Sequence, residues 1–453
     1  MLSIPRFADD IQGRVITADD PEYDSARAVF AGAVDRRPAM IVRAADAADV
    51  ARVIALARES GLELAVRGGG HSPAGHGATE GGIVLDLAAM RAIEIDPERR
   101  TALAETGLTA RDYSVATGAH GLATGFGDAG SVGIGGITLS GGVGFLVRKH
   151  GLTIDNLLAA DVVTADGELV RADADHHPDL FWAIRGGGGN FGVATRLQFR
   201  LQEVDTIVGG MLFLPATADV IAGFVAEAEA APEELSTIAN VVPAPPLPFL
   251  APEHHGRLVV MAMIVHAGDV EAGQRAVAPF RALATPVADM IRPMPYPEMY
   301  PPAEEGYRPV AVSHTLFTES VGRATAETII ERLERSTAPM AVTQLRVLGG
   351  AMARVPADAT AFAHRERRIM ATVVAMYANP EERAEQAAWA ADLAGELGGD
   401  DAGYAGFLGD EGEARVRAAY PGATWDRLAA IKADYDPDNL FRLNQNIPPA
   451  ADA

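Results

Sequence analysis

The chain has 453 residues, no cysteine and a net charge of −23. The lack of cysteine excludes disulfides, thiolate nucleophiles and cysteine-ligated metals, and the negative charge disfavours nucleic acid and anionic membranes as partners. The length predicts more than one domain. No apolar run is long enough to span a membrane, and the first residues, MLSIPRFADDIQG, do not resemble a signal peptide, so we expect a cytoplasmic protein.

A glycine loop with two histidines follows a predicted strand–helix–strand unit. Residues 38–43 predict a strand, Asp46 is a suitable helix N-cap, and Gly61 ends the helix before a second strand. That second strand leads directly into R-G-G-G-H-S-P-A-G-H-G (67–77), and another strand is expected at 81–87. Because α/β sheets bind ligands at the C-terminal ends of their strands, the loop is a candidate binding site.

Further glycine-rich segments lie downstream. Residues 121–144 hold ten glycines among 24 residues, but the interleaved Val, Ile, Leu and Phe predict a packed segment and not a linker. Residues 156–173 predict a hairpin with Asp166-Gly167 as a two-residue turn. Residues 187–192 match the dinucleotide fingerprint G-x-G-x-x-G, yet a helix is expected before them and a strand after them. The fingerprint needs the opposite order, so no Rossmann site is expected here.

From residue 206 onward the glycine clusters disappear and a second α+β domain is expected. Its predicted strands are GGMLFLP, RLVVMAMIVHA, MAVTQLRVLGG and RIMATVVAMYA, and its predicted helices lie near 217–231, 269–284, 324–335 and 381–397. The tail (425–449) predicts a helix, a D-P-D-N turn and a polar segment.

The two glycine-dense loops point to an anionic ligand held by the backbone. Consecutive glycines let main-chain N–H groups approach a pyrophosphate closely. The sequence contains no G-x-x-x-x-G-K-[ST], so it gives no support to a P-loop.

Five segments carry a specific resemblance. R-G-G-G-H-S (67–72), G-x-V-G-I-G-G-x-x-x-x-G-G-x-G (130–144), HGLTIDNLLAADVVTADG (150–167), DLFWAIRGGGGNFGV (179–193) and YDPDNLFRLNQNIP (435–448) occur in this order. Together they resemble the FAD-linked oxidases of the vanillyl-alcohol-oxidase superfamily, in its berberine-bridge-enzyme-like branch. The resemblance covers nearly the whole chain.

The resemblance implies an α+β fold with two parts. One is a two-subdomain PCMH-type FAD-binding domain, made of residues 1–205 and completed by residues 401–453. The other is a substrate domain, residues 206–400, with an antiparallel sheet backed by helices. The implied partners are FAD, a small-molecule substrate and O₂; no metal is expected, and the protein is expected to be a monomer or a homodimer.

His71 is the residue to which the resemblance assigns a covalent bond with the flavin C8 methyl. Many relatives add a second bond from a cysteine, whose position here is Ala129, so a single link is expected. His76 is either a cofactor contact or a polar loop residue. The other expected cofactor-binding residues are Arg67, Gly68, Gly69, Gly70, Ser72, Gly75, Gly127, Asp128, Ser131, Val132, Gly133, Gly136, Gly142, Gly144, Val193, Asn444 and Asn446.

Val132 matches the family's gatekeeper position, where a small residue is associated with access of O₂. This favours an oxidase that releases hydrogen peroxide over a dehydrogenase with another electron acceptor. A flavin-binding protein without turnover is a third reading, because neither familiar catalytic base is present: their positions hold Thr372 and Phe407. The remaining candidates for the base are Tyr404, Tyr377 and His364, each of which can equally be a packing or surface residue.

The substrate is expected to be a neutral or weakly cationic, partly apolar molecule such as an aromatic alcohol or amine, with a carbohydrate as the alternative. An amine of low pKa would need no base. Inward-facing Arg346, Arg354 or Arg365 would instead favour an anionic substrate.

Overall fold

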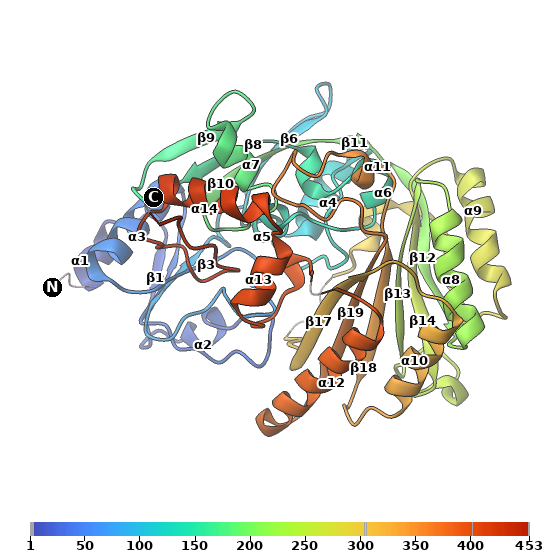
Figure 1. Ribbon diagram of the computed structural model, residues 1–453. Helices are drawn as coiled ribbons and strands as arrows, with labels where there is room; N and C mark the ends of the chain where they lie inside the picture. Colours follow the sequence, from blue (N-terminus) through green and yellow to red (C-terminus); the bar gives the residue numbers. More distant parts are fainter. Residues whose placement is uncertain (1–3, 303, 305, 401, 452–453) are drawn as a thin grey trace.

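The computed structural model describes residues 4–302, 304, 306–400 and 402–451 and has an α+β fold with four sheets. Two sheets of four and five strands make up one side of the molecule, and an eight-stranded sheet makes up the other (Figure 1). The C-terminal helices, drawn in red, return to the side formed by the N-terminal residues. Among the described residues, no helix is long and apolar enough to cross a membrane.

The four-stranded sheet has the order β1-β2-β4-β3. Its elements, with the helices that precede or connect them, are α1 (Ile4–Asp9), β1 (Arg14–Ile16), α2 (Tyr23–Ala26), β2 (Met40–Arg43), α3 (Ala47–Ser60), β3 (Leu64–Arg67) and β4 (Ile83–Asp86). Helix α3 begins and ends as predicted: Asp46 accepts a hydrogen bond from the Asp49 N–H, and Gly61 adopts a left-handed conformation with φ +69°.

Strands β2 and β3 of the predicted strand–helix–strand unit are not neighbours, because β4 lies between them and is parallel to both. This places β3 at the edge of its sheet. The glycine loop that leaves β3 at Arg67 therefore emerges at the border of the sheet and not at its centre.

The five-stranded sheet has the order β5-β6-β10-β8-β9, and β7 pairs with β11 beside it. These elements are β5 (Ile93–Asp96), β6 (Thr101–Glu105), α4 (Ala110–Gly118), β7 (Leu122–Ala123), α5 (Ile134–Ser140), α6 (Val147–His150), η1 (Thr153–Asn156), β8 (Leu157–Val163), β9 (Leu169–Asp173), α7 (Pro178–Ala183), β10 (Val193–Arg200) and β11 (Gln202–Glu203). Because α7 precedes the glycines at 186–189 and β10 follows them, the segment has the order predicted from the sequence, opposite to that of a Rossmann motif.

The β8–β9 hairpin is present, but its turn differs from the prediction. The Thr164 N–H donates to the Glu168 carbonyl at 2.9 Å, and the Gly167 N–H donates to the Thr164 carbonyl at 3.0 Å. The turn therefore contains three residues, 165–167, and not two. The longer turn is stabilised by Asp166, whose carboxylate accepts from the Glu168 N–H at 3.2 Å.

The eight-stranded sheet is antiparallel and has the order β15-β12-β14-β13-β18-β19-β17, with β16 paired to β12. Its elements are β12 (Thr206–Pro215), α8 (Ala218–Ala230), β13 (Leu235–Pro243), η2 (Pro252–His254), β14 (Leu258–His266), α9 (Val270–Ala282), β15 (Ala288–Asp289), β16 (Arg292–Pro295), η3 (Tyr296–Met299), β17 (Ala311–Thr318), α10 (Arg323–Glu334), β18 (Ala341–Val347), α11 (Ala351–Arg354), β19 (Ile369–Met376), η4 (Pro380–Glu382) and α12 (Arg383–Glu396). The tail adds η5 (Ala405–Phe407), α13 (Glu413–Ala419) and α14 (Ala423–Tyr435). The four predicted helices are present, while β13 and β17 are strands that the prediction did not include.

Helices cover one face of this sheet. Residues such as Leu345, Ala371 and Val373 join one core with the apolar residues of α8, α10 and α12. Figure 1 shows these helices along one face of the sheet. The alternating residues of the same strands lie on the opposite face, where Gln344, Val374 and their neighbours remain half-buried. We keep residues 206 and 400 as the proposed limits of the substrate domain.

Candidate FAD site

Two glycine loops touch through their backbones. A Cβ added at Gly69 would collide with the backbone of Gly133, and one added at Gly133 would collide with the backbone of Gly69. Gly70 has φ +68°, which favours glycine. The sequence places glycines here because any side chain would separate the loop after β3 from the segment that begins α5.

A cavity of about 460 Å³ lies where these loops meet. Fourteen of the cofactor residues expected from the sequence line it. They are Arg67, Gly68, Gly69, Gly70, His71, Ser72, His76, Asp128, Ala129, Val132, Gly133, Gly136, Val193 and Asn444. The fold thus brings together residues from four distant parts of the chain.

Six other residues that were expected to bind the cofactor do not line the cavity. The Gly127 carbonyl accepts a hydrogen bond from the Tyr300 hydroxyl, and the Gly142 N–H donates to the Tyr404 hydroxyl. Gly75 and Gly144 are packed against neighbouring atoms that leave no room for a Cβ. Ser131 holds His71 through its backbone, and Asn446 has a buried side-chain oxygen.

The sequence prediction missed several lining residues. Gly188, Gly189 and Asn190 line the cavity, although their segment was used only for the family resemblance and as a rejected Rossmann motif. The run of glycines between α7 and β10 was a signal that could have identified them. Phe30 also lines the cavity, and no motif marks it in the sequence.

The residues of the cavity fit FAD. A Cβ at Gly136 or Gly189 would enter open space, so these glycines leave room for a ligand beside the backbone. Among the described residues, the buried Arg67 Nη1 and Asn444 Oδ1 have no hydrogen-bond partner. One donor for a phosphate and one acceptor for a ring N–H are thus available, between apolar walls that include Leu64, Val66 and Leu87.

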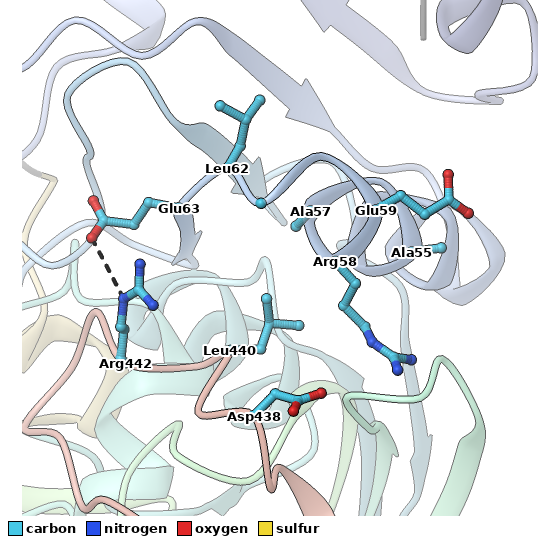
Figure 2. Close-up of a pocket in the computed structure, with 10 residues that line it drawn as sticks. Ala55, Ala57, Arg58, Glu59, Leu62, Glu63, Asp438, Leu440 and Arg442 are labelled. Carbon is cyan, nitrogen blue, oxygen red and sulfur yellow. Dashed lines mark ion pairs between the residues drawn. The ribbon is translucent and has the colours of Figure 1, made fainter. Parts of the chain in front are cut away.

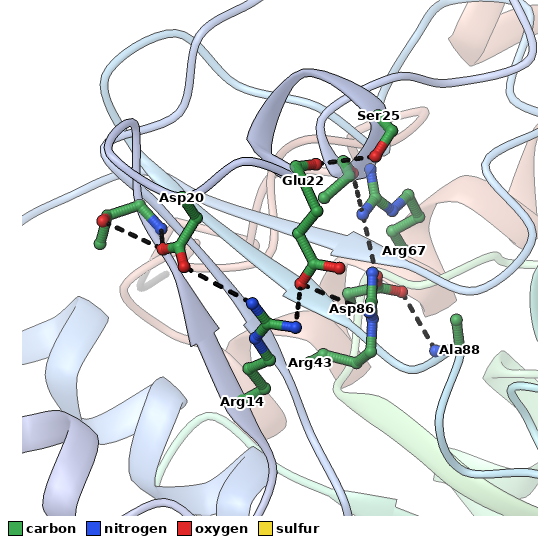
Figure 3. Close-up of polar contacts among 10 residues, drawn as sticks. Arg14, Asp20, Glu22, Ser25, Arg43, Arg67, Asp86 and Ala88 are labelled. Atoms are coloured by element: carbon green, nitrogen blue, oxygen red, sulfur yellow. Dashed lines mark hydrogen bonds and ion pairs between the residues drawn. The ribbon is translucent and has the colours of Figure 1, made fainter.

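Arg67 is held rigidly at the start of the loop (Figure 3). Its Nη2 donates to the Ala26 carbonyl at 2.6 Å and to Asp86 Oδ2 at 3.0 Å. Asp86 also accepts from Arg43 Nε at 3.3 Å, and Arg43 lies 4.0 Å from Glu22, whose carboxylate pairs with Arg14 at 2.7 Å. This network joins the N-terminal segment to β2, β3 and β4 and fixes the guanidinium beside the cavity.

His71 lies in the cavity as a neutral imidazole. Burial lowers its pKa to about 4, against the opposing effects of the Asp128 carboxylate and a hydrogen bond with the Ser131 backbone. The Phe30 ring stacks on the imidazole with centroids 4.1 Å apart and an angle of 17° between the planes. Burial, with the nearby Arg36 guanidinium, likewise lowers the pKa of His76 to about 4.

The three candidate bases lie in different places. Tyr404 lines the cavity, but its hydroxyl accepts the Gly142 N–H at 2.9 Å, and burial raises its pKa to about 12. Tyr377 is buried at the end of β19, outside the cavity wall, with its N–H bonded to the Val310 carbonyl. His364 is bonded through Nε2 to the Ala419 carbonyl at 3.0 Å and packs against the Phe317 ring. The structure therefore brings only Tyr404 to the cavity.

Comparisons with known proteins agree with this site. A family model described as an FAD binding domain matches residues 38–173, and one described as berberine and berberine like matches residues 404–448. The (R)-6-hydroxynicotine oxidase of Paenarthrobacter nicotinovorans is 31% identical, over 97% of this chain and 97% of that protein. The chain belongs to the berberine-bridge-enzyme-like FAD-linked oxidoreductases.

Solved structures support the same fold for this berberine-bridge-enzyme-like oxidoreductase. The crystal structure of 6-hydroxy-D-nicotine oxidase from Arthrobacter nicotinovorans has a TM-score of 0.86 and 29% identity, covering 99% of this chain and 100% of that one. A xylooligosaccharide oxidase from Myceliophthora thermophila has the same TM-score at 24% identity over the full length of both chains, which shows a shared fold alone. The PCMH-type fold, the family and the use of FAD were thus predicted correctly.

The face of the large sheet that the helices do not cover joins the FAD cavity of this oxidoreductase through a chain of polar side chains. Asn240 Oδ1 accepts from Gln344 Nε2 at 2.9 Å, and Gln344 Oε1 accepts from Arg346 Nε at 3.0 Å. Arg346 Nη2 then donates to Asp128 at 2.7 Å, and Asp128 lines the cavity. Around this polar line the face is apolar and half-buried; its residues include Met261, Val342, Val374 and Met376.

A second hollow lies on the outer surface, between the end of α3 and the tail at 438–442 (Figure 2). Its walls carry charges of both signs, with Arg58 and Arg442 beside Glu59, Glu63 and Asp438. The closest pair, Arg442 and Glu63, is 3.8 Å apart and largely exposed. None of the cofactor residues expected from the sequence lines this hollow.

Proposed function

We propose that this FAD-linked oxidoreductase is an oxidase that carries FAD bound covalently through His71 alone. It oxidises a small aromatic alcohol or amine and passes the electrons to O₂, forming hydrogen peroxide. The observation that carries the proposal is the neutral His71 imidazole held in the cavity, because a neutral ring nitrogen is a nucleophile. The chain has no cysteine for a second bond.

Bound FAD supplies the hydride acceptor, and the residues of the chain bind and orient the reactants. The glycine backbones and Arg67 would hold the phosphates, and Asn444 would offer an acceptor to a ring N–H. Tyr404 is protonated at neutral pH and can orient a substrate by hydrogen bonding, but it cannot take the substrate's proton. This favours an amine substrate whose nitrogen is already neutral.

Electron transfer to O₂ is supported by Val132. The side chain lines the cavity and is only half-buried, so a small molecule can reach the space beside it. A dehydrogenase with another electron acceptor remains the second enzymatic candidate.

A neutral substrate is supported by the pairing of the three arginines that could have bound an anionic substrate, because each of them already contacts a carboxylate of the protein. Arg346 is engaged by Asp128 and Gln344, and Arg365 makes a two-pronged pair with Asp155 at 2.7 and 2.8 Å. Arg354 is exposed and paired with Glu233. The apolar sheet face and the relative named for 6-hydroxynicotine also favour an aromatic amine over a carbohydrate.

The covalent bond is tested by acid precipitation. We expect the wild-type pellet to stay yellow and to yield one flavin-bearing histidyl peptide by mass spectrometry. His71→Ala should bind FAD reversibly, because the rest of the cavity is intact, and give a colourless pellet. A colourless wild-type pellet, or a flavin attached to another residue, would contradict the assignment.

The reaction is tested by separating its two halves. A panel of aromatic amines, alcohols, sugars and hydroxy acids is mixed with the oxidised protein without O₂, and the flavin absorbance is followed. Bleaching by amines or alcohols supports the proposed substrate class, whereas faster bleaching by hydroxy acids overturns it. If no member of the panel bleaches the flavin, the flavin-binding protein without turnover is favoured.

Reoxidation of the reduced protein by O₂ then distinguishes an oxidase from a dehydrogenase. We expect Val132→Leu to slow this step about tenfold, a rise of about 1.4 kcal/mol in its barrier, while anaerobic reduction stays unchanged. Equal slowing of both half-reactions would mean that Val132 is only a packing residue.

A further inference from the structure

Phe30 lies in the segment between α2 and β2, far from His71 in the sequence but directly against it in space. The two rings are nearly parallel, 17° apart, with centroids 4.1 Å from each other. The Phe30 N–H also donates to the Gly70 carbonyl at 3.0 Å, so its backbone is fixed to the residue that precedes the histidine. Phe30 is therefore placed by both its main chain and its side chain.

The segment around Phe30 is anchored on both sides. Before it, the Ala26 carbonyl accepts from Arg67 Nη2 at 2.6 Å. After it, Arg36 Nη1 donates to the carbonyls of Gly75 and Ala78 at 3.2 and 2.8 Å. The phenyl ring is thus carried by a segment attached at both ends to the loop that it covers, and it forms a fixed wall behind the imidazole.

We propose that Phe30 is a positioning residue for the covalent attachment of FAD at His71. This inference rests on the proposed covalent bond. A stacked phenyl ring covers one face of the imidazole and leaves the ring edge uncovered, where one nitrogen can react while the other is bonded to the Ser131 backbone. Because stacking restricts rotation of the imidazole, the nitrogen lone pair keeps one direction, as an efficient reaction between two bound groups requires.

The surroundings of His71 also set its protonation. The apolar phenyl face excludes water from one side of the imidazole, and burial lowers its pKa to about 4. The ring edge is held by the Ser131 backbone. A neutral and oriented imidazole is the form that can act as a nucleophile at neutral pH.

Formation of the bond between His71 and the flavin is an oxidation, and O₂ is the oxidant that balances it. One C–H bond of the C8 methyl group and one imidazole N–H bond break, and one C–N bond forms. The two electrons released pass through the flavin to O₂, which takes up the two protons and leaves as hydrogen peroxide. The role of Phe30 is limited to holding the nucleophile.

The test follows attachment directly and needs no substrate. Full-length protein from riboflavin-starved cells is mixed with FAD in air, and acid-stable flavin is measured over time for wild type, Phe30→Ala, Phe30→Leu and Phe30→Tyr. Reversible FAD binding is measured separately in the same variants on a His71→Ala background. Phe249→Ala, an exposed aromatic residue of the other domain, is the matched control.

We expect Phe30→Ala and Phe30→Leu to slow attachment at least about tenfold, corresponding to about 1.4 kcal/mol. On the His71→Ala background, both substitutions should leave the reversible affinity for FAD within about threefold of that of His71→Ala alone. Phe30→Tyr keeps an aromatic ring stacked on His71 and should form acid-stable flavin at the wild-type rate. Phe249→Ala should also attach FAD at the wild-type rate. Attachment by Phe30→Leu at the wild-type rate would overturn the inference, as would a parallel loss of rate and affinity in both slow variants. If the wild type itself forms no acid-stable flavin, the proposed covalent bond is what fails.

Discussion

Tyr404 reaches the cavity without the properties of a general base. Its hydroxyl oxygen is occupied by the Gly142 N–H, and its pKa is raised to about 12 because the ring is fully enclosed. A base working near neutral pH requires a pKa near that pH. Its position in the cavity follows from the family motif, but its protonation depends on burial that no motif specifies.

We expect Tyr404→Phe to reduce the rate of anaerobic flavin reduction by less than about tenfold, because general-base catalysis typically contributes about 10²- to 10⁴-fold and Tyr404 does not supply it. The pH profile of the reduction should keep its shape. Rapid-mixing absorbance measurements from pH 6 to pH 10 provide the comparison. A loss of 100-fold or more together with a changed profile would restore Tyr404 as the base.

His71 and Phe30 differ in how far the sequence predicts them. His71 follows three glycines at the end of a strand, and this motif identifies it without a structure. Phe30 is a single aromatic residue in an irregular segment, and only the tertiary fold places it on the imidazole. Arg67 and Asn444 were expected to contact the cofactor, but their unpaired atoms become visible only when all their other partners are known.

At the scale of secondary-structure elements, the best predictions concern segments with clear end signals. Asp46 and Gly61 marked the two ends of α3, and both adopt the expected capping conformations. Strand β13 was missed because nearly all of its residues are buried, so it lacks an alternating pattern. The order β2-β4-β3 was not predictable from local sequence, because it depends on which strand enters between two others.

Residues 136–144, which begin inside α5 and extend beyond its end, offer a test in which two similar substitutions have opposite effects. Gly136 lies inside the helix and faces open space, so Gly136→Ala should leave the fold intact and stabilise the apoprotein by up to about 1 kcal/mol. The added methyl group enters the cavity, and FAD occupancy should fall. Gly144→Ala, whose Cβ would collide with the Phe126 carbonyl, should instead give little folded protein.

These two variants are compared by thermal unfolding of the apoproteins and by flavin content after purification. The control is Gly395→Ala, because Gly395 has an ordinary φ and open space around it. Gly61→Ala is not a suitable control because Gly61 has φ +69°. If Gly136→Ala retains full flavin content, the open space at Gly136 does not belong to the FAD site.

At the scale of the whole molecule, four histidines share one property. Burial is the largest cause that lowers the pKa of His71, His76, His150 and His364, each to about 4. Since an unfolded histidine titrates near 6.5, the unfolded chain binds more protons than the folded chain between about pH 4 and pH 6.5. The stability from these neutral histidines is therefore complete above pH 6.5 and is lost as the pH falls toward 4.

We expect the melting temperature of the apoprotein, in which all four imidazoles are free, to be nearly constant between pH 7.5 and pH 6.5 and to fall steadily down to pH 4.5. His364 lies away from the cavity, so His364→Gln removes one proton from the difference without touching the cofactor. In this variant, the slope of the free energy of unfolding against pH should decrease by at most about 1.4 kcal/mol per pH unit, and the melting temperature should fall less steeply. His120→Gln, at an exposed position, is the control and should keep the wild-type slope; an unchanged slope in His364→Gln would contradict the assignment.

The cavity wall is assembled from nearly the full length of the chain, from Phe30 to Gln445. The late part of the wall is fastened by the buried Lys432, whose ammonium group donates to the Asn190 and Phe441 carbonyls at 2.7 and 3.0 Å and to Asp436 at 2.5 Å. During synthesis, a ribosome must therefore translate the whole stretch from Phe30 to Gln445 before the wall can close. We therefore expect flavin to be captured only by chains whose translation has passed Gln445.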